Sequence, residues 1–358
     1  MINVTKTFVP NKSKYKEYVD EILNSGWFTN NGKFVQKLEK RLEEFLGVKN
    51  LVLVSNGTLA LQIAYKALEL SGEVITTPFS FVATTSSLVW EGLNPVFADI
   101  DSNTYCIDPN KIEERITEKT SAIVPVHVFG NPCDVEKIDE IAKKNNLKVV
   151  YDAAHAFDVK FNGQSVLNYG DISTLSFHST KIFHTIEGGA LIIKDDEVYK
   201  KVKKLINFGI TGPDVIDGLG INSKMNEFQA AMGLCVLDEF ENIKNNRKKV
   251  YEYYRENLSN KLKFQILNKD VEWNYSYFPV EFEMEEQLLK VKKVLNDNNI
   301  YPRRYFYPSL ETLNYIKEKY EVENSSSLSK RILCLPFYDS LTKDELDKII
   351  NIVNEIVS

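Results

Sequence analysis

Short apolar segments alternate with stretches of helical periodicity over the first two-thirds of the chain, and this alternation restricts the fold more than any other feature. Strands are predicted over residues 52–54, 73–77, 95–99, 121–127 and 148–152. Helices are predicted between them, over residues 57–70, 81–90, 110–116 and 135–145. Such βαβ units build a largely parallel sheet with helices on both faces. The sequence therefore predicts an α/β fold.

The pattern changes after about residue 223. The predicted elements there are a long helix over 227–258, a strand-like run over 275–282, a helix over 285–298, a strand-like run over 332–335 and a helix over 342–357. The three serines at 325–327 are expected to lie in a loop. This mixed order indicates two domains, a large one over residues 1–235 and a smaller α+β domain over residues 236–358.

Composition excludes several classes of function. The net charge of −6 argues against a protein that binds nucleic acid or a membrane surface through its overall charge. No apolar run reaches the length of a membrane span, and the first residues lack the apolar core of a signal peptide. The four cysteines are far apart and form no CxxC pair, so neither a metal site nor a disulfide framework is expected. We therefore expect a cytoplasmic enzyme.

The segment from Asp171 to Ile193 points most directly to chemistry. It contains an apolar strand, a polar turn that carries Lys181, a Gly-Gly pair and a second apolar strand. Burial between strands lowers the pKa of a lysine and makes its amine a usable nucleophile. Asp152 ends an earlier strand in the run KVVYDAA. Pyridoxal phosphate chemistry needs such a pair: a lysine that forms a Schiff base and an aspartate that pairs with the protonated pyridine nitrogen.

The segment Ser55–Leu61 is predicted to hold an anion. It runs from a strand into a helix, where a glycine permits close backbone approach, the first helical amides are free and Thr58 adds a hydroxyl. It matches neither GxGxxG nor GxxxxGK[ST], which disfavours NAD and ATP as ligands. Phe81, which follows a strand-ending proline, can stack on a flat heterocycle, and His155 can hydrogen-bond a phenolic oxygen.

Each of these residues also has a purely structural interpretation. A lysine between strands is commonly a solvated turn residue, and an aspartate after a strand commonly caps the next helix. Phe81 can be a core aromatic and His155 a structural hydrogen-bond partner. Their order, spacing and flanking sequence favour the chemical interpretation.

The flanking sequence resembles the DegT/StrS-type nucleotide-sugar aminotransferases over nearly the whole chain. The matching segments, in order, are NGTLAL, TPFSFVAT, PVHVFGNPCDV, YDAAHAF, SFHSTK with EGGA, and GINSKMNEFQAA. The resemblance implies the aspartate-aminotransferase-like fold of type I, pyridoxal 5'-phosphate as cofactor and a homodimer with shared active sites. It implies no metal.

The resemblance also implies roles for the cofactor-binding residues. Lys181 would be the Schiff-base lysine, Asp152 the pyridinium partner, His155 the contact to the phenolic oxygen and Phe81 the stacking aromatic. The phosphate would be held by Gly57, Thr58 and Ser176, together with Asn222 from the neighbouring subunit. Because some family members replace the lysine with histidine and act as dehydratases, the presence of Lys181 implies transamination.

The substrate contacts that the resemblance implies lie in two other segments. The segment WFTNNG, which includes Trp27 and Asn31, matches the mouth of the active site. The late segment PRRYFYP matches the region that contacts the sugar nucleotide, and it includes Tyr305 and two arginines, Arg303 and Arg304, either of which can pair with a diphosphate. His184 and Glu187 either face the sugar or lie in an exposed turn.

The predicted function is therefore amino transfer from glutamate to a dTDP-linked 4-oxo-6-deoxyhexose. The product, a dTDP-4-amino-4,6-dideoxyhexose, would supply a surface polysaccharide such as an O-antigen in lipopolysaccharide biosynthesis. Amination at carbon 3 of a 3-oxo sugar is the alternative. A non-catalytic cofactor-binding regulator would be expected to carry a DNA-binding domain or to lack the lysine, and a nicotinamide dehydrogenase would be expected to carry the glycine fingerprint.

Overall fold

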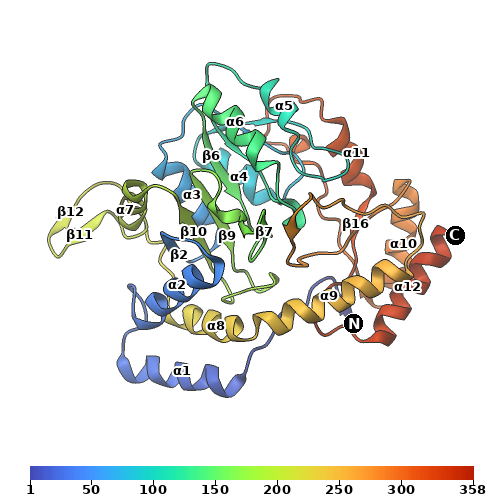
Figure 1. The fold of residues 1–358 in the computed structure, drawn as a ribbon, viewed down its shortest axis with the longest axis horizontal. Helices are drawn as coiled ribbons and strands as arrows, with labels where there is room; N and C mark the ends of the chain where they lie inside the picture. The colour runs from blue at the N-terminus through green and yellow to red at the C-terminus, as the bar shows by residue number, and fades with distance from the viewer.

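A seven-stranded sheet forms the centre of the computed structural model, which describes all residues from 1 to 358 (Figure 1). Its strands, in spatial order, are β2 (Leu51–Val54), β10 (Gly189–Ile193), β9 (Ile172–Ser176), β6 (Lys148–Asp152), β5 (Thr120–Val124), β3 (Glu73–Thr76) and β4 (Asn94–Phe97). Only β10 runs antiparallel to its neighbours, and all other pairs are parallel. The predicted α/β class with a mostly parallel sheet is confirmed.

Helices cover both faces of this sheet. One face packs on α3 (Gly57–Ala67), α4 (Val82–Trp90) and α7 (Asp196–Leu205), and the other packs on α2 (Lys33–Leu46), α6 (Val135–Asn145) and α8 (Glu227–Asp238). Successive residues of β2 show the consequence, because Leu51 and Leu53 belong to one apolar cluster and Val52 and Val54 to the other. A strand that is buried on both faces consists of consecutive apolar residues, which explains why these strands could be predicted from the sequence.

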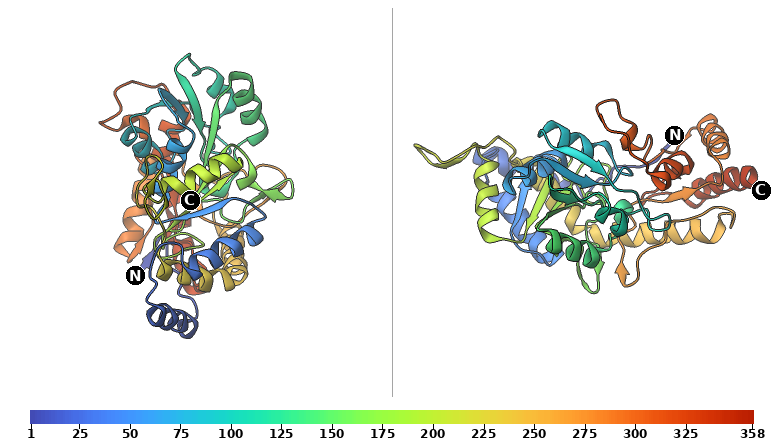
Figure 2. Two further views of the ribbon diagram at one scale, coloured as in Figure 1. Left: turned by 90° about the vertical axis from the view of Figure 1, so that its left-hand side faces the viewer. Right: turned by 90° about the horizontal axis from the view of Figure 1, so that it is seen from above.

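Several shorter elements surround the sheet. These are α1 (Lys12–Ser25), which packs on α8, the short helix α5 (Pro109–Glu113), a three-stranded sheet of β13 (Val271–Glu272), β7 (Lys160–Phe161) and β8 (Gln164–Ser165), and three 3-10 turns at Val128–Gly130, Val166–Asn168 and Leu310–Thr312. The hairpin of β11 (Ile210–Gly212) and β12 (Val215–Ile216) projects from the body of the protein (Figure 2).

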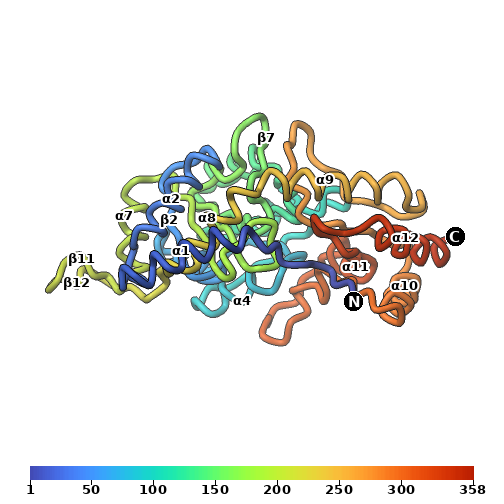
Figure 3. The backbone as a smooth tube through the Cα atoms, turned by 90° about the horizontal axis from the view of Figure 1, so that it is seen from below, coloured from blue at the N-terminus to red at the C-terminus, as the bar shows by residue number.

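A third apolar cluster lies in the C-terminal part of the chain. It is built by α9 (Phe240–Asn257), α10 (Glu285–Asp297), α12 (Lys343–Val357), and the strand pair β14 (Pro279–Glu281) and β16 (Ile332–Cys334). The helix α11 (Glu323–Arg331) leads directly into β16. β1 (Ile2–Asn3) joins this part by pairing with β15 (Ile300–Tyr301), so both termini lie at the same end of the molecule (Figure 3). No helix is both long and apolar enough to cross a bilayer.

We propose the division into residues 1–235 and 236–358 as an approximate one. The boundary falls within α8, which packs on α1 and α2, and the first strand pairs with the C-terminal part. The C-terminal apolar cluster, to which α9 contributes Tyr254, is nevertheless distinct from the two clusters that flank the sheet.

Three local predictions are wrong. The predicted long helix over 227–258 is interrupted at Glu239, which ends α8 and precedes α9. The helix predicted over 110–116 ends at Glu113. Ser325, Ser326 and Ser327 lie inside α11 and not in a loop. Their side chains find partners there that the local sequence does not reveal: Ser325 Oγ contacts Ser309 Oγ at 2.7 Å, and Ser326 Oγ donates to Glu311 at 2.8 Å.

Glu227, the first residue of α8, provides a test of how the start of α2 is held. Its buried carboxylate accepts the free N–H groups of Phe34 (2.7 Å) and Val35 (3.1 Å) in the first turn of α2. Glu227→Ala would leave both donors buried without a partner, so we expect a loss of about 1–3 kcal/mol in the free energy of unfolding. Urea denaturation measures this loss. Glu44→Ala, at an exposed position of α2, is the matched control, and equal stability of the two variants would contradict the prediction.

Candidate active site

A cavity of about 280 Å³ opens at the carboxyl ends of the parallel strands. Asp152 is the last residue of β6, Ser176 is the last of β9, and Asn56 follows β2 by two positions. Ligands bind at this edge of parallel sheets. The cavity is lined by ten of the predicted residues: Gly57, Thr58, Phe81, Asp152, His155, Ser176, Lys181, Glu187, Arg303 and Tyr305.

Lys181 lies on the turn between β9 and β10 and points into this cavity. Burial lowers the pKa of its amine from 10.5 to about 8, although the charge of Asp152 and the nearby Tyr305 act in the opposite direction. Its Nζ donates a hydrogen bond of 3.2 Å to the hydroxyl of Tyr277. At pH 7 about one-tenth of such an amine is neutral, far more than at the usual pKa of 10.5, and a nucleophile or proton acceptor requires the neutral form.

Asp152 is a buried carboxylate without an ion-pair partner. Burial raises its pKa, whereas hydrogen bonds from Thr84 Oγ1 (2.7 Å) and the N–H of Ala154 (3.2 Å), together with the charge of Lys181, lower it. A carboxylate in this position favours a cation brought in by a ligand, because the protein supplies none in direct contact with it.

His155 is held as a neutral imidazole. Its Nδ1 accepts the N–H of Phe129 at 3.3 Å, and burial, with the charge of Lys181 as a smaller cause, holds the pKa of the ring well below its usual range. The proton of the neutral ring is therefore on Nε2, which is left to donate. The ring stacks on Phe306 with centroids 5.8 Å apart and meets Tyr277 edge-on at 4.8 Å.

The part of the cavity at the start of α3 has the groups that bind an anion. Asn56 caps α3 by accepting the N–H of Leu59 (2.9 Å), and the amides of Gly57 and Thr58 remain free. A Cβ on Gly57 would lie only 2.8 Å from the Cβ of Ser176, so glycine is needed where helix and strand meet. Phe81, the residue before α4, lines the cavity with half of its surface exposed.

Five predicted residues do not line the cavity. Arg304 pairs with Glu285 at 2.6 Å, and buried His184 has its Nε2 2.8 Å from the carbonyl oxygen of Phe8. The structure therefore corrects the expectation that Arg304 or His184 faces the ligand. Trp27 and Asn222 are exposed outside the cavity, and Asn31 borders a second cavity of about 480 Å³ beside the β11–β12 hairpin.

The structure adds Tyr277, Phe306 and Thr84 to the predicted site. Tyr277 and Phe306 line the cavity, and Thr84 donates to Asp152 from α4. Tyr277 lies in a run of alternating aromatics that predicts only a strand, so no local signal separates it from core residues. Tyr277 is identified as a site residue only by its hydrogen bond with Lys181 in the structure.

The residues present fit pyridoxal phosphate. A nucleophilic lysine, an unpaired carboxylate, a neutral histidine donor, an exposed aromatic face and a set of free amides lie in one cavity, and each corresponds to a different group of that cofactor: aldehyde, pyridine nitrogen, phenolic oxygen, ring face and phosphate.

The comparisons with known proteins agree on one family. The DegT/DnrJ/EryC1/StrS aminotransferase family matches residues 11–354. The chain is 44% identical to dTDP-4-amino-4,6-dideoxy-D-glucose transaminase of Shigella dysenteriae, over 99% of each chain, and 41% identical to the Escherichia coli protein of the same name, over 97% of this chain and 96% of the relative. The crystal structure of DesI in the presence of its TDP-sugar product superposes with a TM-score of 0.94 at 31% identity, covering 99% of this chain and 93% of DesI.

The lowered pKa of Lys181 predicts how cofactor uptake depends on pH. Only the neutral amine attacks an aldehyde, so the rate at which cofactor-free protein takes up pyridoxal phosphate should rise with pH and level off above about 8. If the amine had its usual pKa of 10.5, the rate of cofactor uptake would continue to rise at higher pH. Absorbance measures the rate, and α-N-acetyl-lysine with the same aldehyde corrects for titration of the cofactor itself. A midpoint equal to that of the free amine would contradict the prediction.

Proposed function

Because the chain belongs to the DegT/DnrJ/EryC1/StrS aminotransferase family, we propose that it moves an amino group from glutamate to carbon 4 of a dTDP-linked 4-oxo-6-deoxyhexose. The chain is a pyridoxal-phosphate-dependent aminotransferase. The observation that carries the choice of carbon 4 and of dTDP is the 44% identity, over 99% of each chain, to a transaminase named for dTDP-4-amino-4,6-dideoxy-D-glucose. The alternative remains amination at carbon 3. A regulator without catalysis is disfavoured by the retained Lys181.

Bound pyridoxal phosphate supplies an electron sink for bond changes at the carbon that bears nitrogen. In our proposal Asp152 pairs with the ring nitrogen, His155 donates from Nε2 to the phenolic oxygen, and Phe81 stacks on the ring. The phosphate would be held by the free amides at the start of α3 and by the hydroxyls of Thr58 and Ser176. The burial of Asp152 and the N–H donated by Phe129 to His155 support these assignments.

In each half of the reaction, Lys181 is proposed to move a proton at Nζ between the substrate carbon that bears nitrogen and the cofactor. A pKa of about 8 allows the amine to accept a proton and to return it without a large barrier in either direction. The hydroxyl of Tyr277, 3.2 Å away, orients the amine when it is not covalently bound.

Arg303 is the arginine that we assign to the sugar nucleotide. It lines the cavity and forms no ion pair, whereas Arg304 is engaged by Glu285. A guanidinium beside the open side of the cavity suits a diphosphate. Tyr305 lies beneath it, with the Arg303 Cζ 5.2 Å from the ring centroid.

We also propose that the active unit is a homodimer with shared sites. The projecting hairpin and its base expose large apolar side chains, with Ile216 and Leu219 each 74% exposed and Phe208 49%. Unpartnered apolar side chains of this size favour a protein contact. Asn222 lies at the same base, and in our proposal it reaches the phosphate of the neighbouring subunit, while Trp27 and Asn31 border the completed mouth.

The proposed product is an activated amino sugar, which suits transfer into a surface polysaccharide such as an O-antigen. A cytoplasmic location is proposed because four free, buried cysteines suit a reducing compartment.

The substrate assignment is tested with purified enzyme, glutamate and dTDP-linked 4-oxo or 3-oxo 6-deoxyhexoses, with NMR locating the new amine. We expect amination at carbon 4. Lys181→Ala is the control: it should bind the cofactor but lose at least about 10³-fold in turnover, because no other amine can carry the proton. Amination at carbon 3 alone would support the alternative, and near-normal turnover of Lys181→Ala would remove that residue from its assigned role.

Shared sites are tested by mixing two inactive variants, Lys181→Ala and Asn222→Asp, the second of which would repel the phosphate. A mixed dimer contains one site with both changes and one with neither, so partial activity should return after subunit exchange. Light scattering gives the oligomeric state, and labelled subunits verify the exchange. An active monomer, or verified exchange without recovered activity, would contradict the shared site.

A further inference from the structure

We propose that Asp99 is a positioning residue for the sugar-nucleotide half of the reaction, because it caps α11 and thereby holds the segment that brings Arg303 and Tyr305 into the active-site cavity. This inference rests on the proposed function only in assigning Arg303 to the sugar nucleotide. Asp99 lies outside the cavity and contacts no ligand-binding residue directly.

Asp99 is a buried carboxylate that follows β4 at the edge of the sheet, with 9% of its surface exposed. It forms no ion pair. Its two oxygens instead accept three backbone N–H groups: one from the adjacent Ile100 (2.8 Å), and two from Asn324 (2.8 Å) and Ser325 (2.9 Å). Both distant donors belong to the first turn of α11.

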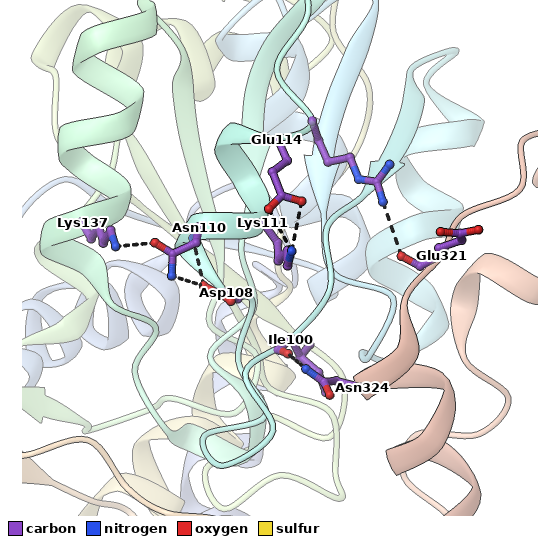
Figure 4. Close-up of polar contacts among 9 residues, drawn as sticks. Ile100, Asp108, Asn110, Lys111, Glu114, Lys137, Glu321 and Asn324 are labelled. Carbon is purple, nitrogen blue, oxygen red and sulfur yellow. Dashed lines mark hydrogen bonds and ion pairs between the residues drawn. The ribbon is translucent and has the colours of Figure 1, made fainter.

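The contact replaces a cap that α11 lacks. Val322 stands at the N-cap position and has no side chain able to accept a hydrogen bond. A carboxylate at the free amides of a helix start is stabilised by those hydrogen bonds and by the helix dipole. Figure 4 shows the neighbouring contact, in which Asn324 Nδ2 donates to the carbonyl of Ile100 at 2.8 Å. Just before α11, the carbonyl oxygen of Glu321 accepts a hydrogen bond of 3.4 Å from the Arg115 guanidinium.

Two connections lead from α11 to the cavity. The helix runs directly into β16, and there Cys334 exchanges two backbone hydrogen bonds with Arg303, of 3.0 and 2.8 Å. At its first turn, Ser325 contacts Ser309 at 2.7 Å, and the next residue, Leu310, donates to the carbonyl of Pro78 at 2.9 Å. The segment from Arg303 to Leu310 is therefore held near both ends by α11 and by the strand β16 that follows it. The hydrogen bonds to Asp99 fix the position of α11.

Apart from Phe306, which lies in the held segment and stacks on His155, the residues proposed to hold the cofactor are not positioned by α11. Lys181, Asp152, His155 and the start of α3 are positioned by the ends of the sheet strands. Displacement of α11 should therefore weaken binding of the sugar nucleotide and leave the reaction with glutamate largely unchanged.

The experiment compares Asp99→Ala with Asp108→Ala in the holoenzyme and measures the two half-reactions separately. Asp108 is the matched control, since its carboxylate accepts the N–H (2.9 Å) and the Nδ2 (3.0 Å) of Asn110 at the start of α5, which carries no cavity residue (Figure 4). We expect Asp99→Ala to raise the KM for the sugar nucleotide by about tenfold, with the glutamate half-reaction changed by less than about twofold. Asp108→Ala should match the wild type in both.

Hydrogen exchange of the cofactor-free protein gives a readout that does not require activity. Faster exchange is expected over residues 323–331 and at 303–305 in Asp99→Ala and not in Asp108→Ala. If Asp99→Ala does not fold, Asp99→Asn keeps one acceptor oxygen without the charge and should show a smaller change in the same direction. Unchanged exchange in both segments would overturn the proposal.

A double variant separates the proposed path from a general loss of stability. In an Arg303→Ala background, Asp99→Ala should cause little further rise in KM, because the group that it positions is gone. A full tenfold rise in that background, or equal loss in both half-reactions, would overturn the positioning role. Failure of the wild type itself to aminate any dTDP-linked ketosugar would refute the proposed function, while the exchange measurement would still decide whether Asp99 holds the segment.

Discussion

Burial of the central sheet on both faces is the constraint on which the rest of the structure depends. Because helices cover both faces, only the ends of the strands are open to a ligand, and the parallel strands present their carboxyl ends at one edge. Asp152, Ser176 and the start of α3 therefore converge although they are far apart in the sequence. Lys181 lies in the same place because its turn follows β9.

The electrostatics of the site follow from this burial. The same loss of hydration raises the pKa of Asp152, lowers that of Lys181 to about 8 and keeps His155 neutral. A buried carboxylate without a partner is costly for the folded protein, and a cationic ring nitrogen would relieve that cost. Cofactor binding should therefore stabilise the fold as well as supply the chemistry.

The cavity is nevertheless a composite of two parts of the chain. The sheet supplies the residues proposed to hold the cofactor, whereas Tyr277, Arg303 and Tyr305 come from the C-terminal part, where they meet Lys181 and the open side of the cavity. Contacts that join the two parts, such as the hydrogen bond from Tyr105 to Glu281 and the cap supplied by Asp99, are thus as important to the site as its lining. This division of labour allows substrate preference to vary without change in the cofactor site.

The sequence by itself determined the α/β class, most strands of the sheet and the residues at their ends, because two-sided burial and helix starts leave local patterns. It also singled out Lys181, Asp152, His155 and Gly57, which the structure brings together in one cavity. Only the tertiary structure showed that Arg303 lines the cavity whereas Arg304 pairs with Glu285 from another element. It also showed that the three serines expected in a loop belong to α11. The carboxylate that caps this helix is that of Asp99, more than two hundred residues away in the sequence. Such contacts join residues that are far apart in the sequence, so the local sequence pattern around either residue does not predict them.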